Sequence, residues 1–110
     1  MLIHLDDEYF NLIKSGIKTI ELRLYDEKRR KIKIGDKIDF ENRKDSERIK
    51  VEVVNLHIFD NFEELYKHFD KNSMGYLDDE EASYLDMEEF YSKEEQEKYG
   101  VVGIEIKLIK

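Results

Sequence analysis

The chain has 110 residues, of which 40% are hydrophobic and 42% charged, so it is long enough for one small domain and too short for two. It contains no cysteine, which excludes disulfides, thiolate nucleophiles and cysteine-ligated metal sites and favours a reducing cytoplasm. No apolar run approaches the roughly 18 residues of a membrane span, and no targeting segment precedes the first charged residues, so we expect a soluble protein with no membrane contact.

The net charge of −8 argues against indiscriminate nucleic-acid binding, because affinity for phosphate comes from Lys and Arg. The charge is unevenly placed: residues 1–59 carry 13 Lys/Arg against 12 Asp/Glu, whereas residues 60–97 carry 3 against 14. Two basic runs in the first half could form a basic face, or could be a solvated loop and a charged hairpin. Their members are Lys28, Arg29, Arg30, Lys31 and Lys33, then Arg43, Lys44, Arg48 and Lys50.

The first elements are a short strand over Met1–Leu5 and a helix over Asp7–Lys14. Asp6 precedes the helix as a capping residue, and Gly16 follows it as a stop signal. The chain then enters a strand from about Lys18 to Leu24.

Side chains alternate between the two faces of a strand, so this second strand has an apolar and a charged face. The apolar face consists of Ile20, Leu22 and Leu24, and the other consists of Thr19, Glu21, Arg23 and Tyr25. Lys18 lies at the start of the strand, where the turn can direct it towards Glu21 and Arg23. Three converging ionisable groups can bind a polar ligand or do proton chemistry, or they can be an ordinary ion pair on an edge strand.

The middle of the chain predicts a turn at residues 34–36 and strands over Lys37–Glu41 and Arg48–Phe59. The apolar face of the longer strand changes near Val53 and Val54, which indicates a bulge of the kind that small barrels use to turn corners.

The last third predicts three helices and a closing strand. A helix capped by Asp60 or Asn61 runs to about Phe69 with an apolar stripe of Phe62, Leu65, Tyr66 and Phe69. An acidic connection over 70–84 follows, anchored by Met74, Tyr76 and Leu77, and then a short helix over Leu85–Tyr91. Ser92 and Glu95 form a capping box for a helix that ends near Gly100, before a strand over Val101–Ile109.

Five or six strands with helices in the connections favour a small α+β barrel over a parallel doubly wound sheet. Neither a Walker-type nor a dinucleotide-binding fingerprint is present, so we expect no cofactor. The three histidines, His4, His57 and His68, fall in separate elements without ligand spacing, and we expect no metal site.

Gly16, Lys18, Glu21 and Arg23 resemble the GxKxxExR motif of the ASCH domain, a PUA-like β-barrel module. The resemblance extends to Ile34-Gly35-Asp36 and to the closing strand from Tyr99 to Ile104, and so covers nearly all of residues 1–110 as a single domain. It implies an α+β fold, a small PUA-like mixed β-barrel of five to six strands. It also implies a cleft in which the motif's Lys, Glu and Arg bind RNA or a nucleotide-like ligand.

One branch of the family hydrolyses acetylated cytidine nucleosides with a Lys, a Thr and a distant Glu. Lys18 and Arg23 match that branch, but Glu21 stands where it has the Thr, and Thr19 is displaced by a shift along the strand. Glu88 or Glu89 could supply the distant carboxylate, and both could equally be solvated residues of an acidic helix. Phe90, Tyr91 and Tyr99 could each supply a ring for base stacking, and each could be a plug of the barrel core.

Three functional hypotheses remain at this stage. The first is a module that binds RNA or a nucleoside or nucleotide through Lys18, Glu21, Arg23 and Tyr91. The second is a hydrolase of a modified nucleoside or of RNA, with Glu21 as base and Lys18 as electrostatic stabiliser. The third is a structural ion pair of Glu21 and Arg23 that closes the barrel mouth.

Overall fold

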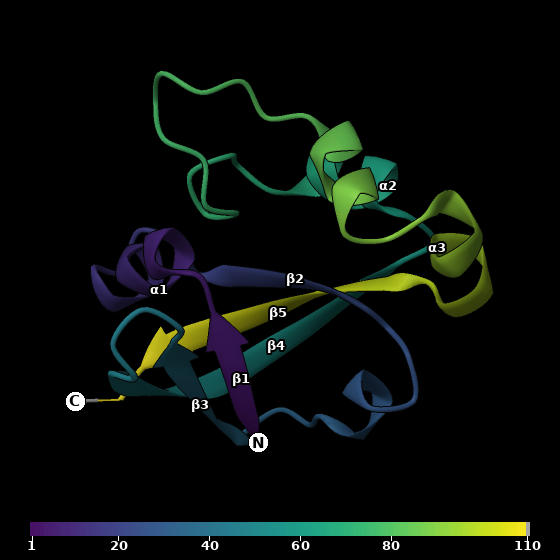
Figure 1. Cartoon of the computed structure of the whole chain (residues 1–110). Coiled ribbons are helices and arrows are strands. Elements are labelled where there is room, and N and C mark those ends of the chain that lie inside the picture. The colour runs from purple at the N-terminus through teal and green to yellow at the C-terminus, as the bar shows by residue number, and fades with distance from the viewer. Residues whose placement is uncertain (110) are drawn as a thin grey trace.

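A computed structural model, which describes residues 1–109, shows a curled five-stranded sheet with helices in its connections (Figure 1). The strands are β1 (Leu2–Leu5), β2 (Ile20–Leu24), β3 (Lys37–Asn42), β4 (Arg48–Phe59) and β5 (Val101–Leu108). The α-helices are α1 (Asp7–Lys14), α2 (Phe62–His68) and α3 (Lys93–Tyr99), and two 3-10 helices, η1 (Arg29–Lys31) and η2 (Tyr84–Glu89), lie between them in the chain. The predicted α+β class and mixed sheet are confirmed, in the form of a half-barrel.

The order of strands in the sheet is β1-β3-β4-β5-β2. The β1–β3 pair is parallel and the other pairs are antiparallel, so β1 and β2 are the two edges of the described sheet. The register of β4 against β5 shifts between Val53 and Asn55, which confirms the predicted bulge. Since a bulge bends a strand, it contributes to the curl of the sheet.

The apolar side chains form two clusters on opposite faces of the sheet. The first is built mainly from β1, β3, β4, β5 and α1, and its fully buried members include Phe10, Ile13, Phe40, Val51 and Ile104. The second lies between β2 and the α2–η2 segment, with Ile20, Leu22, Leu24, Phe62 and Leu65 among its members. The predicted apolar face of β2 and the predicted stripe of α2 therefore meet in this second cluster.

Most boundaries agree with the sequence, and the differences have local causes. Gly16 has a φ of +85°, as a left-handed helix stop requires, and the capping box of Ser92 and Glu95 is present. Asp6 occupies the N-cap position of α1, but its side chain makes no capping hydrogen bond. The expectation that Leu77 anchors the 70–84 connection is wrong, because 42% of its surface is exposed.

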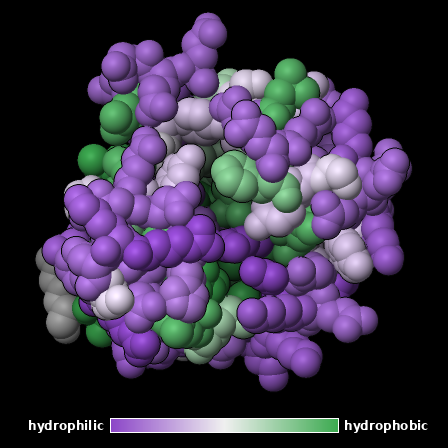
Figure 2. Space-filling view, viewed as in Figure 1, coloured by the Kyte–Doolittle hydropathy of each residue, from purple (hydrophilic) through white to green (hydrophobic). Residues whose placement is uncertain are grey.

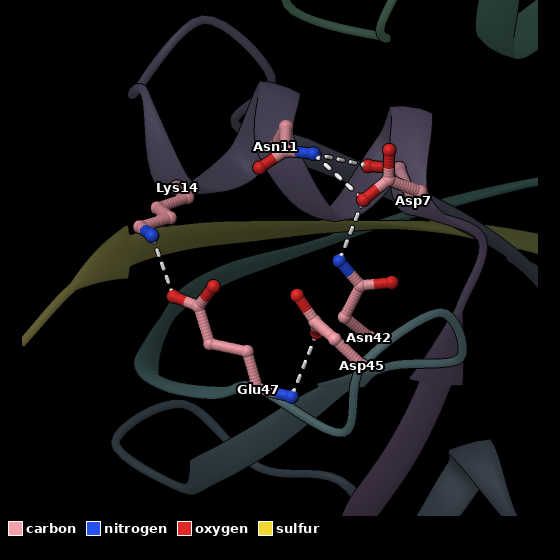
Figure 3. A network of polar contacts seen from close by, with 6 residues as sticks. All are labelled: Asp7, Asn11, Lys14, Asn42, Asp45 and Glu47. Atoms are coloured by element: carbon pink, nitrogen blue, oxygen red, sulfur yellow. Dashed lines mark hydrogen bonds and ion pairs between the residues drawn. The ribbon is translucent and has the colours of Figure 1, made fainter.

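Helix α1 is tied to the β3–β4 hairpin by a polar network (Figure 3). Asn42 is 2% exposed, and its Nδ2 donates to Asp7 Oδ1 at 2.8 Å, while its Oδ1 accepts from the Lys44 backbone N–H at 2.9 Å. Lys14, at the other end of the helix, pairs with Glu47. The helix is thus held at both ends, which fixes Tyr9 on the edge of the cavity described below.

No helix within residues 1–109 is long and apolar enough to cross a membrane.

Candidate functional site

Glu21 and Arg23 lie on the inner face of β2, above the first core cluster. In the β2–β5 register Glu21 is opposite Ile104 and Arg23 is opposite Val102, and directly paired residues share a face. Glu21 Oε2 accepts from Arg23 Nη2 at 3.0 Å, and Glu21 Oε1 is 3.5 Å from Lys18 Nζ. The structure therefore brings together the three motif residues, Lys18, Glu21 and Arg23, which we call the charged triad.

Lys18 is positioned by a turn from a distant part of the chain. Its backbone N–H donates to Leu12 O at the end of α1. The backbone N–H groups of Thr19 and Ile20 both donate to Ser73 O, so β2 begins at Ile20, two residues later than predicted. The Lys18 ammonium donates to Met74 O at 2.9 Å. A Cβ on Gly75, which has a φ of +106°, would lie 3.1 Å from Lys18 Cδ. The lysine stem is thus packed so closely against Gly75 that an added Cβ would force it to shift.

Burial and mutual attraction set the protonation of the charged triad. Lys18 is 4% exposed and Glu21 5%. Burial lowers the pKa of Lys18, although Glu21 opposes the shift. Burial alone would raise the pKa of Glu21, but the charges of Lys18 and Arg23 outweigh it and lower that pKa. Burial alone would lower the pKa of Arg23. The side chains of Glu21 and Tyr91 outweigh burial and raise this pKa. Glu21 is therefore ionised and a weak base, suited to orienting the two cations.

The charged triad lines a cavity of about 340 Å³ between the β1–α1 segment and the 74–91 segment. Figure 2 shows a hollow on the corresponding face, with apolar surface at its floor and hydrophilic surface at its rim. The volume is within the range of small-molecule sites, roughly 300–1,000 Å³. The residues around it include Tyr9 from α1, Arg43 from the β3–β4 hairpin, Tyr66 from α2, and Met74, Tyr76, Glu80, Asp86, Glu89, Phe90 and Tyr91.

A hydrogen-bonded chain of two tyrosines and an aspartate lines the cavity from α2, the following loop and η2. The hydroxyls of Tyr66 and Tyr76 are 2.8 Å apart, and Tyr76 donates to Asp86 Oδ2 at 2.8 Å. Burial raises the pKa of Tyr66 to about 12 and also raises that of Tyr76, so both remain protonated at neutral pH. Sequence reasoning placed Tyr66 in an apolar stripe and Tyr76 as an anchor, and missed their polar ends because only the tertiary fold brings these hydroxyls together.

The aromatic candidates fall into three different environments. Tyr91 lines the cavity, but its ring stacks on Phe62 with centroids 5.9 Å apart. Phe90 also lines the cavity, and 59% of its surface is exposed. Tyr99 lies elsewhere, with its carbonyl accepting from Arg30. Phe90 is therefore the ring that is open to a ligand, with Tyr91 beside it.

The remaining candidate residues divide between the cavity and the rest of the surface. Glu89 lines the cavity, whereas Glu88 and Thr19 lie outside it. Of the two basic runs Arg43 alone reaches it, and there it pairs with Asp6 at 3.0 Å. The rest of the second run also pairs with carboxylates, as Lys44–Asp7, Arg48–Glu41 and Lys50–Asp39 show, so this run is a charged hairpin and not a free basic face.

Two of the three histidines lie close together, which their separate elements did not suggest. The rings of His57 and His68 are 5.9 Å apart beside Phe69, and His57 hydrogen-bonds Glu105 at 2.8 Å. Within residues 1–109 no group of three or more His, Cys, Asp or Glu side chains has the arrangement of a metal site.

The model of the ASCH domain matches residues 3–110, so the chain belongs to the ASCH domain family. The crystal structure of the hypothetical protein PH0355 is 40% identical in sequence, with a TM-score of 0.77 over 98% of this chain and 97% of that one. The solution structure of protein PF0455 from Pyrococcus furiosus is 37% identical, with a TM-score of 0.69 over 100% of this chain and 99% of that one.

A mutant of ZmASCH from Zymomonas mobilis shares the fold at 13% identity, with a TM-score of 0.67 over 99% of this chain and 71% of that one. No curated protein matches the sequence. The family resemblance read from the motif is confirmed, and the ASCH domain points to an RNA-binding or hydrolase type of module.

Proposed function

We propose that the cavity binds the base of an unstacked RNA nucleotide or of a free nucleoside or nucleotide. The proposal is carried by one observation: the buried charged triad opens onto the same cavity as the exposed ring of Phe90. A ring of this kind offers a stacking surface, and the donors of Lys18 and Arg23 suit the carbonyl groups of a base edge. Glu21 orients both donors, and the ring of Tyr91 borders the stacked base.

The stacking step is tested by Phe90→Ala, because this residue is exposed enough to be replaced without disturbing the core. Stacking contributes about 1–3 kcal/mol per base, so we expect binding of a short single-stranded oligoribonucleotide, or of a panel of nucleosides and nucleotides, to weaken about 5-fold to 150-fold. Leu85→Ala is the matched control, since Leu85 is an apolar residue of the same segment, 52% exposed and outside the cavity. Equal affinities in the two variants would exclude stacking on Phe90.

The charged groups are tested by Lys18→Met and Glu21→Gln, measured for binding and for stability together. Loss of binding beyond what partial unfolding explains supports recognition by the triad. Lower stability with unchanged affinity in the folded fraction supports the structural reading of the triad instead.

A second candidate function is hydrolysis of an N-acylated nucleoside, favoured by the buried ammonium of Lys18 with its lowered pKa. Water would add to the acyl carbon, the C–N bond would break, and the exocyclic amine would leave with a proton. Lys18 would stabilise the oxyanion of the intermediate, and Glu21 or Glu89 would take the proton from water. Because its lowered pKa makes Glu21 a weak base, Glu89 is the expected proton acceptor. Turnover of N-acylated cytidines by the protein should then be lost in Lys18→Met and in Glu89→Gln.

A further inference from the structure

We propose that one side of the cavity is a specificity element that rejects ligands carrying a phosphate group and selects uncharged nucleosides with a free amine. This acidic side consists of Glu80, Asp86 and Glu89, from the loop before η2 and from η2 itself. The inference rests on the proposed function, because it names which base-containing ligands the cavity takes.

The cations around the cavity are already neutralised by carboxylates. Lys18 and Arg23 share Glu21, and Arg43 pairs with Asp6 at 3.0 Å. The Lys18 ammonium also donates to a backbone carbonyl, and it is almost completely buried. A phosphate group entering this space would therefore meet paired cations, and it would have to compete with Glu21 or Asp6 for each of them.

The carboxylates, in contrast, exceed the cations. Glu8, Glu80, Asp86 and Glu89 all line the cavity, and within residues 1–109 none of their carboxylate oxygens has a Lys, Arg or His side-chain nitrogen within 4 Å. Lys71 Nζ donates to the backbone carbonyl of Glu80 at 2.6 Å and leaves its carboxylate unpaired. Six carboxylates thus surround the cavity against three Lys and Arg side chains. The excess follows from the uneven charge of the chain, since residues 60–97 carry 3 Lys/Arg against 14 Asp/Glu.

Two members of the acidic side are fixed by hydrogen bonds and cannot turn away freely. Asp86 Oδ2 accepts from Tyr76 at 2.8 Å, and Glu80 Oε1 accepts from the Leu77 backbone N–H at 2.8 Å. Each carboxylate keeps a second oxygen with no donor among the described residues. These oxygens can accept from an amine of a ligand, whereas they repel an anion.

The size of the discrimination follows from Coulomb's law in solvent. A phosphate dianion at roughly 9 Å from three carboxylates, in a medium close to water and screened over about 8 Å, is disfavoured by about a factor of five. An uncharged nucleoside has no such penalty. A short RNA avoids this penalty if a single base enters the cavity and the phosphates remain outside.

The experiment is titration calorimetry with adenosine, cytidine and guanosine, each compared with its 5′-monophosphate. We expect each nucleoside to bind about fivefold more tightly than its monophosphate, with the ratio falling as salt screens the repulsion. The isosteric triple variant Glu80→Gln, Asp86→Asn and Glu89→Gln keeps the hydrogen-bond acceptors, and its ratio should fall below about twofold. A control with the same change in net charge, Glu63→Gln, Glu94→Gln and Glu97→Gln, alters exposed residues of α2 and α3 outside the cavity and should leave the ratio unchanged.

Monophosphates that bind as tightly as nucleosides, or more tightly, overturn the inference and leave the proposed function standing. A fivefold ratio that persists in the triple variant and at higher salt also overturns it, because the discrimination would then be steric. Absence of binding by every nucleoside, monophosphate and oligoribonucleotide is the distinct result that refutes the proposed function itself.

Discussion

Replacing Glu21 by Gln removes one negative charge from between two buried cations, and it should destabilise the protein substantially. Glu21 accepts from Arg23 at 3.0 Å and lies 3.5 Å from Lys18, and both Glu21 and Lys18 are nearly inaccessible to water. Breaking a buried ion pair by removing one partner costs about 3–5 kcal/mol. Because the side chain of Arg23 is 19% exposed and can recover some hydration, we expect about 3 kcal/mol, at the lower end of that range.

Urea unfolding at neutral pH measures this loss, and Glu52→Gln is the matched control. Glu52 pairs with Lys37 at 2.7 Å, closer than Glu21 to either of its partners, but half of the Lys37 side chain is exposed. We therefore expect a much smaller loss in the control, since solvent screens exposed pairs. Equal losses in the two variants would refute the reasoning that burial, and not distance, decides how much an ion pair contributes to the free energy of unfolding.

A double variant extends this test. Adding Lys18→Met to Glu21→Gln removes the uncompensated buried ammonium, so the double variant should lose less stability than the sum of the single losses. Strict additivity would mean that the two side chains do not interact in solution.

Three further predictions concern the surroundings of the triad. Gly75→Ala places a Cβ 3.1 Å from Lys18 Cδ at a φ of +106°, and urea unfolding should show a loss of about 1–3 kcal/mol; an unchanged midpoint would contradict the packing described. Asn42→Ala leaves Asp7 and a backbone N–H without their partner, and we expect a loss of about 1–3 kcal/mol by the same assay. Asn42→Asp should lose at least as much, because it removes the donor to Asp7 and places a second carboxylate against it at a buried position. The pKa of Glu21 in the folded protein is lowered from 4.5, so its contribution to stability is present above pH 4.5 and is lost as the pH falls through that lowered pKa. The difference in the free energy of unfolding between wild type and Glu21→Gln should therefore become smaller in acid. A difference that does not change with pH would contradict this.

The sequence was most informative where a regular element determined the geometry. Alternation along β2 was enough to place Glu21 and Arg23 on one face, and the glycine stop after α1 was enough to place Lys18 beside them. The bulge near Val54 followed in the same way from a change in apolar periodicity. In each case the pattern and its cause lie within one or two neighbouring elements.

The remainder of the site comes from contacts between distant segments, which periodicity does not encode. Met74 and Gly75 reach Lys18 from 56 and 57 positions further along the chain, through a turn with no repeating pattern. The only signal in the sequence was Gly75 itself, and a glycine in an acidic loop does not reveal which side chain it packs against. The exposure of Leu77 was mistaken for burial for a related reason, since an apolar residue in an irregular loop has no face that sequence alone can assign.

The position of β5 in the sheet has a consequence for the order in which the site can form during synthesis. β2 lies near the start of the described chain, yet β5 is its sole neighbour in the described sheet, and β5 is the last of the five strands. A growing polypeptide therefore exposes the Lys18–Arg23 segment on the ribosome long before its pairing strand emerges. Until then the two cations and the carboxylate of this segment lack the strand that pairs with β2. Pairing of β2, and with it the final environment of the charged triad, must therefore wait until β5 has been synthesised.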